Sequence, residues 1–357
     1  MDGFKTHKFG VYSAYYDDRN TSNPIIRVIG VTRVEQPENV TCRLYYDTIQ
    51  HQEGSEDTMN RKYLSHNHMK SESFSDVPGT ITLLQEQHEA YYHACYILCP
   101  LNDSDFHTGK SFTIPTDVGI SSIMLPDLNN TYRLPIVNSN EHNSTEKYRA
   151  FKNEIGLCVK PIHSFYNNWL ELVTFIELNK ILGVSKFIVY NESMSENVNC
   201  VFKYYKESEN LVSIKSWNLL QNLELVTHQD ASNLNLTSLY KDKISKSVIQ
   251  NRGVLAALND CLYQHMYEYK YLFSMDLDEF IIPHMHDTIP EMLKHMRSND
   301  DKNMDDDEHF KRGKNNILKL SNPNSATSYI FQNAMFYQQY GKSFAPWARI
   351  IIAIRFY

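Results

Sequence analysis

Between residues 155 and 283, short runs rich in β-branched and aromatic residues alternate with longer segments of helical periodicity. This alternation predicts βαβ units, in which helices connect parallel strands. Gly183 follows the first helical segment and predicts its end. The pattern therefore predicts an α/β fold with a doubly wound sheet. Its strands are expected at 155–159, 186–190, 211–217 and 271–275, and its helices at 167–182, 198–205 and 250–267.

Two aspartates, Asp276 and Asp278, directly follow the last of these strands. Residues i and i+2 of an extended segment project to the same side, so we expect both carboxylates to face one target. Ligands of doubly wound sheets bind outside the carboxyl ends of the strands. Carboxylates bind Mg2+ and Mn2+, and substrate phosphates and water complete the metal shell. The pattern predicts a metal-diphosphate site, and an acidic loop that merely ends a strand is the alternative.

Two stretches around the expected strand ends have a specific sequence. The segment 276–283 has the sequence DLDEFIIP, and the segment 158–161 has the sequence CVKP. At these two stretches, and in the same order also at 11–19, 176–190, 200–205, 255–263 and 332–337, the chain resembles glycosyltransferase family 92.

The resemblance implies a GT-A fold, which is a doubly wound nucleotide-sugar-binding domain. It implies a metal-dependent hexosyltransferase that moves a sugar, with galactose expected, from a UDP-sugar to a glycan acceptor on a glycoprotein or glycolipid. The implied cofactor is Mn2+, with Mg2+ as the alternative. The implied location is the Golgi or another secretory-pathway lumen. A non-catalytic protein that binds glycans or nucleotide sugars on the same fold is the alternative function.

Carried over by position, the resemblance gives Asp276 a place near the ribose and the metal, and Asp278 the role of chelating the metal. Glu279 has two interpretations, one in which it orients a neighbouring base and one in which it is a structural partner. Lys160 and Arg252 are candidates for cationic contacts to the donor diphosphate, with surface pairing to nearby carboxylates as the alternative. Tyr190 is a candidate for stacking on the donor, with core packing as the alternative.

The catalytic base is not identifiable in this sequence. The chain stops at Tyr357, soon after the 332–337 match, whereas family members continue. We therefore expect a glycosyltransferase domain over 151–357 that is incomplete at its C-terminus, and a base beyond Tyr357 is one option.

The first part of the chain has a different pattern. Runs of β-forming residues at 11–16, 25–32, 41–46 and 90–98 are separated by polar segments, of which 50–59 and 64–75 are expected to be loops. We expect a β-rich, sandwich-like domain over 1–137. A segment at 138–150, rich in Asn, Ser and Glu, is the expected linker.

Six cysteines give a further constraint. In an oxidising lumen, Cys42 is expected to pair with Cys95 or Cys99, and the sequence leaves the choice open. The other three, Cys158, Cys200 and Cys261, are expected to be small buried hydrophobic residues. Several Asn-x-Ser/Thr triplets are compatible with a glycoprotein but are common in an Asn-rich chain.

Composition limits the classes of binding partner that we expect for this chain. The net charge of −7, without a dense basic stripe, argues against nucleic acid, because binding to phosphate backbones depends on clustered Lys and Arg. Residues 1–10 lack the apolar core of a signal peptide, and no run approaches the roughly 20 apolar residues that cross a bilayer. Membrane attachment is therefore expected only through an anchor outside this sequence.

Overall fold

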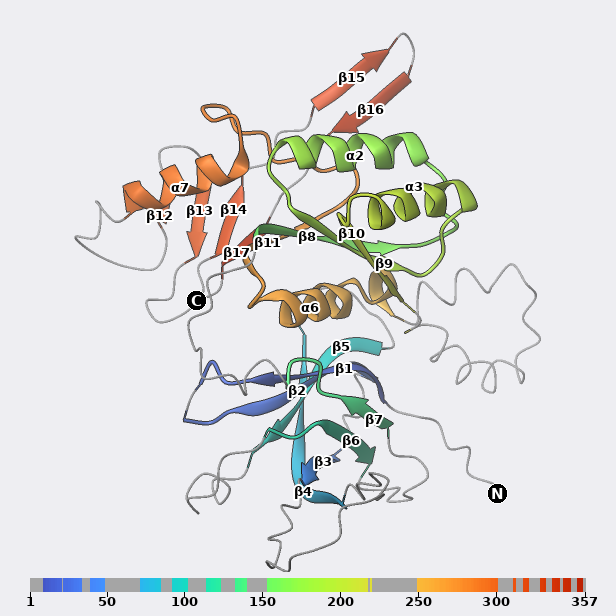
Figure 1. The fold of residues 1–357 in the computed structure, drawn as a ribbon, viewed down its shortest axis with the longest axis vertical. Coiled ribbons are helices and arrows are strands. Elements are labelled where there is room, and N and C mark those ends of the chain that lie inside the picture. Colours follow the sequence, from blue (N-terminus) through green and yellow to red (C-terminus); the bar gives the residue numbers. More distant parts are fainter. Residues whose placement is uncertain are drawn as a thin grey trace, which may run out of the picture. The chain divides into compact units, whose positions relative to one another are not determined.

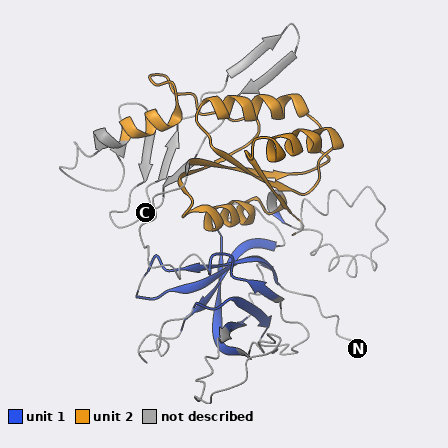
Figure 2. Ribbon diagram, in the orientation of Figure 1, with its two compact units in different colours: residues 1–147, 247–250 blue, residues 148–246, 251–357 orange. Residues whose placement is uncertain are grey.

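The computed structural model describes residues 9–20, 22–33, 39–48, 71–84, 92–101, 114–122, 132–139, 153–217, 219 and 249–300, together with six short strands between 311 and 355. The chain divides into two compact units (Figure 2). The first comprises residues 1–147 and 247–250, and the second comprises residues 148–246 and 251–357. Among the described residues, no helix is long and apolar enough to span a bilayer.

The first unit is a seven-stranded antiparallel sheet. The strands are ordered β1-β2-β5-β4-β3-β6-β7. The β-rich prediction is confirmed, and strand β4 joins the part formed by β1, β2 and β5 to the part formed by β3, β6 and β7. Their bounds are β1 (Phe9–Asp17), β2 (Ile25–Arg33), β3 (Val40–Thr48), β4 (Ser71–Leu83), β5 (Tyr92–Pro100), β6 (Asp117–Ser122) and β7 (Tyr132–Pro135).

Strand β4 was not expected, because its first residues fall in the segment predicted as a polar loop. Among residues 73–83 of this strand, whose burial is described, only Val77 is buried, so the apolar signal is weak. Pairing on two sides holds the strand instead: residues 71–79 pair with β3, and residues 80–83 pair with β5. At the crossover, a Cβ on Gly79 would lie 2.7 Å from Cys42 Sγ, so the close approach requires glycine.

Residues that follow β7 pack beside β1. Ile136 forms a parallel bridge with Ala14. Asn138 is buried, and its side-chain amide both accepts a hydrogen bond from the Tyr16 N–H and donates one to the Tyr16 carbonyl, each at 2.8 Å. The predicted linker at 138–150 therefore does not begin at Asn138, and its residues 140–150 lie outside the described part of the chain.

The second unit contains the predicted alternation of strands and helices. In chain order these elements are β8 (Asn153–Ile162), α2 (Trp169–Ile181), β9 (Lys186–Asn191), α3 (Glu196–Glu207), β10 (Val212–Ser216), a 3-10 turn (Gln250–Gly253), α6 (Val254–His265), β11 (Tyr269–Met275) and α7 (Ile289–Asp300).

The sheet of this unit is mixed. Its parallel part has the order β10-β9-β8-β11, which confirms the predicted parallel pairing. Strand β17 (Ile352–Arg355) then pairs antiparallel with β11. Beyond β17 follow β14 (Ser328–Phe331), β13 (Ile317–Leu320) and β12 (Lys311–Arg312). A separate two-stranded sheet consists of β15 (Phe336–Tyr340) and β16 (Ser343–Trp347).

Local sequence explains where helix α2 starts and stops. Asn168 precedes the helix, and its side chain accepts a hydrogen bond from the Glu171 N–H, which satisfies one of the free donors of the first turn. Gly183 follows the helix with φ +103°, a left-handed conformation that glycine adopts without a Cβ clash. The expected end of the helix is thus confirmed.

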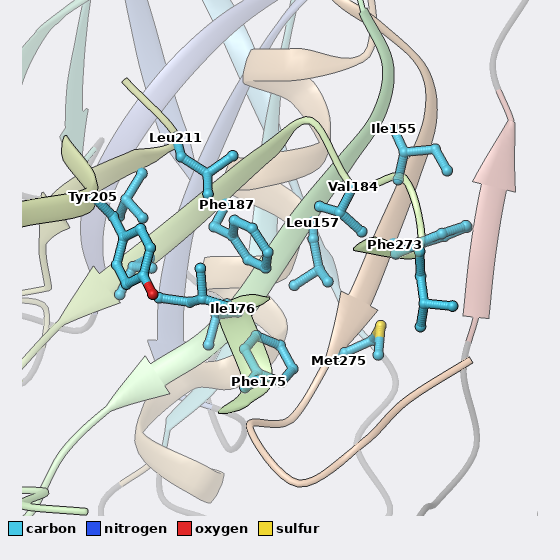
Figure 3. Close-up of a cluster of buried hydrophobic side chains, with 14 of the residues drawn as sticks. Ile155, Leu157, Phe175, Ile176, Val184, Phe187, Tyr205, Leu211, Phe273 and Met275 are labelled. Atoms are coloured by element: carbon cyan, nitrogen blue, oxygen red, sulfur yellow. The ribbon is translucent and has the colours of Figure 1, made fainter. Parts of the chain in front are cut away.

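Alternate residues of the strands point to opposite faces of the sheet. Helices α2 and α3 lie on one face and α6 on the other (Figure 1). Leu157 and Phe273 pack with Phe175 of α2 in the larger core (Figure 3). Their strand neighbours point toward α6, since Cys158 is bonded to Cys261 of that helix. Burial of a side chain of this size contributes roughly 1.5 to 3 kcal/mol of transfer free energy. This packing stabilises the strands whose ends carry the candidate site.

Candidate functional site

The site lies where the connection order of the sheet reverses. From β8 the chain moves to β9 and β10 on one side, and it then returns to β11 on the other side of β8. The carboxyl ends of β8 and β11 therefore flank a topological switch point, the place where open α/β sheets bind ligands. Met275 pairs with Val159 in the β11–β8 register. The residue that follows each of these two is a predicted site residue: Asp276 follows Met275, and Lys160 follows Val159.

Pro161 explains why the pairing of β8 with β9 becomes irregular beside Lys160. The β8–β9 register is regular up to Val159 and shifts before Ile162. Proline has no N–H to donate to a neighbouring strand, so the ladder is interrupted at this residue. Such irregularities often re-aim a side chain beside a functional site. Here the Lys160 Nζ lies 2.7 Å from Asp276 Oδ2.

The two aspartates lie on a tight turn and not on an extended segment. The Glu279 N–H donates a hydrogen bond to the Asp276 carbonyl at 3.1 Å, which closes a four-residue turn over 276–279. The expectation that Asp276 and Asp278 project alike because the segment is extended is therefore wrong. The physical reason is that β11 ends at Met275, one residue before the first aspartate.

Glu279 stabilises this turn through a hydrogen bond of its side chain. Its side chain is buried, and Oε2 accepts a hydrogen bond from the Asp276 N–H at 2.9 Å. Burial raises the pKa of the Glu279 carboxyl above its ordinary value, and the charges of Asp276 and Asp278 add to this effect, against the opposing hydrogen bond from the Asp276 N–H and the charge of Lys160. These contacts agree with the interpretation of Glu279 as a structural partner.

The carboxylate oxygens of Asp276 and Asp278 are suitable ligands for Mn2+ or Mg2+. Asp278 is exposed and makes no hydrogen bond or ion pair with any described residue. Within the described ranges, no three His, Cys, Asp or Glu side chains are grouped to hold a metal. Mg2+ is commonly bound through one or two carboxylates, with substrate phosphates and water as the other ligands. Asp276 and Asp278 fit that limited protein contribution.

The loop after β8 adds residues that the sequence did not single out. The Tyr166 hydroxyl donates to Glu171 Oε2 at 2.7 Å, and the Asn168 amide donates to the same oxygen at 2.9 Å. Burial, the hydrogen bond to Glu171 and the charges of Glu171 and Asp278 together raise the pKa of Tyr166. The Asn168-x-x-Glu171 spacing of a helix cap was the available signal.

Tyr190 and Arg252 belong to a different cluster. Tyr190 is fully buried, and its hydroxyl donates to Asp260 Oδ2 at 2.6 Å, an oxygen that also accepts from Lys215 Nζ at 2.7 Å. The Arg252 guanidinium is paired with Glu192. Across the described residues, no hydrogen bond or ion pair connects Tyr190 or Arg252 to either aspartate of the turn. The structure thus shows core packing for Tyr190 and pairing with a carboxylate for Arg252. These were the alternative interpretations of the two residues.

A disulfide connects the site strand to helix α6. Cys158 of β8 is bonded to Cys261, which follows Asp260 of the buried cluster. This bond corrects the expectation that both are small buried hydrophobic residues. In the first unit, Cys42 pairs with Cys99, one of the two predicted partners, while Cys95 remains a buried thiol whose pKa is raised by burial to about 12.

Comparison with known proteins identifies the family. No curated protein matches the chain. A ferredoxin-NADP+ reductase from Plasmodium falciparum, solved with 2'P-AMP, is similar at 8% identity over 73% of this chain and 94% of that chain, with a TM-score of 0.14. That score is too low to relate the folds. The model of glycosyltransferase family 92 matches residues 153–350, more than half of the chain, from β8 past β16. The chain belongs to glycosyltransferase family 92.

Proposed function

We propose that the second unit is a metal-dependent glycosyltransferase of GT-A type, which moves galactose from UDP-galactose to a glycan acceptor. The observation that carries this proposal is the acidic turn at 276–279, which follows β11 at the switch point and lies next to Lys160 of β8. Family membership supports transferase chemistry with a sugar donor and a glycan acceptor. The donor, the sugar and the metal are the proposed details.

The charges at the turn suit a departing diphosphate. As the bond between galactose and UDP breaks, negative charge grows on the diphosphate, and groups that stabilise this charge lower the barrier. Asp276 and Asp278 would hold Mn2+, which supplies positive charge next to the leaving group. Lys160 is placed to add an ammonium group on the same side of the turn, because its Nζ already lies 2.7 Å from Asp276. Lysine is a common phosphate-binding residue.

We further propose that the protein acts in an oxidising secretory compartment. Both disulfides support this location, since such bonds persist in lumenal and extracellular environments and are rare in the cytosol. One lies in each compact unit, so oxidation would stabilise both parts of the chain.

Donor turnover tests the proposal. The purified chain is incubated with UDP-galactose, UDP-glucose or UDP-N-acetylglucosamine, with Mn2+ and a panel of glycan acceptors, and released UDP is measured. The proposal predicts acceptor-dependent UDP release that is greatest with UDP-galactose and absent in Asp278→Asn. Binding of UDP-galactose without release would instead favour a non-catalytic donor-binding protein, and release that persists in the variant would contradict the role of the turn.

A further inference from the structure

Lys160 and Asp276 form an ion pair across the switch point. Each belongs to a different strand end, and their side chains are 38% and 39% exposed. Because both groups reach solvent, the pair can exchange partners without opening the core. Ion pairs of this exposure contribute at most about 1 kcal/mol, so an incoming ligand can replace one partner.

The two aspartates of the turn differ in whether a cation is paired with them. Among the described residues, Lys160 is the cation paired with the Asp276 carboxylate, and Asp278 on the same turn has no cation partner. The buried carboxylate of Glu279 is directed to the Asp276 N–H and not to Lys160. The ammonium group thus occupies one oxygen of a carboxylate that a divalent cation would need.

A divalent cation and the Lys160 ammonium repel each other when both approach Asp276. A diphosphate offers the ammonium several anionic oxygens as an alternative partner. When a diphosphate is present, the cation can bind Asp276 while Lys160 keeps an anionic partner, whereas the cation alone must compete with Lys160.

We propose that Lys160 is an exchangeable counter-ion, which pairs with Asp276 in the ligand-free protein and moves to the donor diphosphate when cation and nucleotide bind. The inference rests on the proposed donor site and adds a rule for how that site is filled. It makes the binding of Mn2+ and of UDP cooperative. Cooperativity of this kind is reciprocal, so each ligand increases the affinity for the other by the same factor.

The test measures this coupling factor. Free Mn2+ is followed by electron paramagnetic resonance during titration of the full chain, with and without saturating UDP, and the ratio of the two dissociation constants is the coupling. In Lys160→Met, we expect Mn2+ alone to bind about threefold more tightly, because its competitor is gone. We expect the coupling factor to fall by the same factor, about threefold, while Lys160→Arg retains most of the coupling.

A matched control is present on the neighbouring strand. Lys270 of β11 pairs with Glu154 at 3.0 Å, with side chains 32% and 45% exposed. Lys270→Met removes a similar exposed ion pair in the same sheet and is expected to leave both Mn2+ constants unchanged. Thermal unfolding of each variant verifies that it is folded.

The outcomes separate the inference from the proposed function. Wild-type protein that binds UDP with Mn2+, together with an unchanged coupling factor in Lys160→Met, would overturn the counter-ion role and leave the donor site standing. Loss of coupling in Lys160→Arg equal to that in Lys160→Met would also overturn it, because the charge would not be the cause. Wild-type protein that binds neither ligand would overturn both.

Discussion

Asp276 and Glu279 hold each other through two hydrogen bonds. Glu279 Oε2 accepts from the Asp276 N–H at 2.9 Å, and the Asp276 carbonyl accepts from the Glu279 N–H at 3.1 Å. The side chain of the fourth residue thereby fixes the backbone of the first. This arrangement presents the two aspartates at the end of β11 and separates the structural carboxylate of Glu279 from the two carboxylates that we propose hold the metal.

The first prediction concerns this buried carboxylate. Glu279→Ala leaves the Asp276 N–H without its side-chain acceptor, so the turn loosens. The affinity for UDP in the presence of Mn2+ is expected to fall about tenfold, as for other residues that orient metal ligands. Glu279→Gln retains an oxygen that can accept the same hydrogen bond, and its affinity should stay within about threefold of wild type. Calorimetry of both variants measures the difference. Equal losses in the two would show that the hydrogen bond is not the cause.

Tyr190 gives a prediction that separates stability from binding. Tyr190→Phe removes the hydroxyl that donates to Asp260 and retains the ring that packs edge-on against Trp217 at 5.4 Å. The free energy of unfolding should fall by about 2 kcal/mol, the contribution of a hydrogen bond to a charged group. UDP affinity should not change. A variant of normal stability with weakened UDP binding would restore Tyr190 as a donor-stacking residue.

The Cys158–Cys261 disulfide predicts a loss of stability on removal. It joins residues 103 positions apart, so it restricts the unfolded chain strongly. The Cys158→Ala, Cys261→Ala double variant should lose about 3 to 4 kcal/mol in the free energy of unfolding. Cys200 is exposed and unbonded, and Cys200→Ala is the control that should change little. Denaturant unfolding of the three proteins tests this, and equal midpoints would refute it.

Asp17 predicts a specific pH dependence of stability in the first unit. Burial alone would raise the pKa of this carboxyl, but hydrogen bonds and charges from Arg19 and Arg27 outweigh burial and hold the pKa below its ordinary value. A carboxyl with a depressed folded pKa stabilises the fold above its unfolded pKa, and that stabilisation is lost as the pH falls through the folded pKa.

The matching experiment compares wild type with Asp17→Asn by denaturant unfolding. At pH 7 the variant should be less stable by about 2 kcal/mol, because two hydrogen-bonded guanidinium groups lose their anion. At a pH below the folded pKa the Asp17 carboxyl is neutral in both states, and the difference should shrink markedly. A difference that is constant with pH would contradict the charge-based explanation.

The sequence predicted the elements of the second unit well because each has a strong local signal. The helix cap at Asn168 and the left-handed Gly183 define α2 within one or two residues. The aspartates were placed correctly after β11. The turn geometry was not predictable, because it depends on hydrogen bonds between Asp276 and the buried Glu279. The pairing of Asp276 with Lys160 was not predictable either, because Lys160 lies on a strand more than a hundred residues earlier.

The remaining differences have the same physical origin. Strand β4 carries few buried apolar residues, so its pairing on two sides had no signature in hydrophobic periodicity. Cys158 and Cys261 are brought together by the packing of α6 on β8, which spacing along the chain does not reveal. Arg252 pairs with Glu192, which lies 60 residues away in the sequence. Partner choice among charged and sulfur-containing residues was decided by tertiary structure.

The most direct test of the central claim is calorimetric titration of UDP into the purified chain, with and without Mn2+, alongside Asp278→Asn. Asp278 is exposed and has no partner among the described residues, so its substitution should leave thermal unfolding unchanged. We predict UDP binding that requires Mn2+ in the wild-type protein and is lost in the variant. Binding that is indifferent to both Mn2+ and Asp278 would contradict the assignment of the 276–279 turn as the donor site.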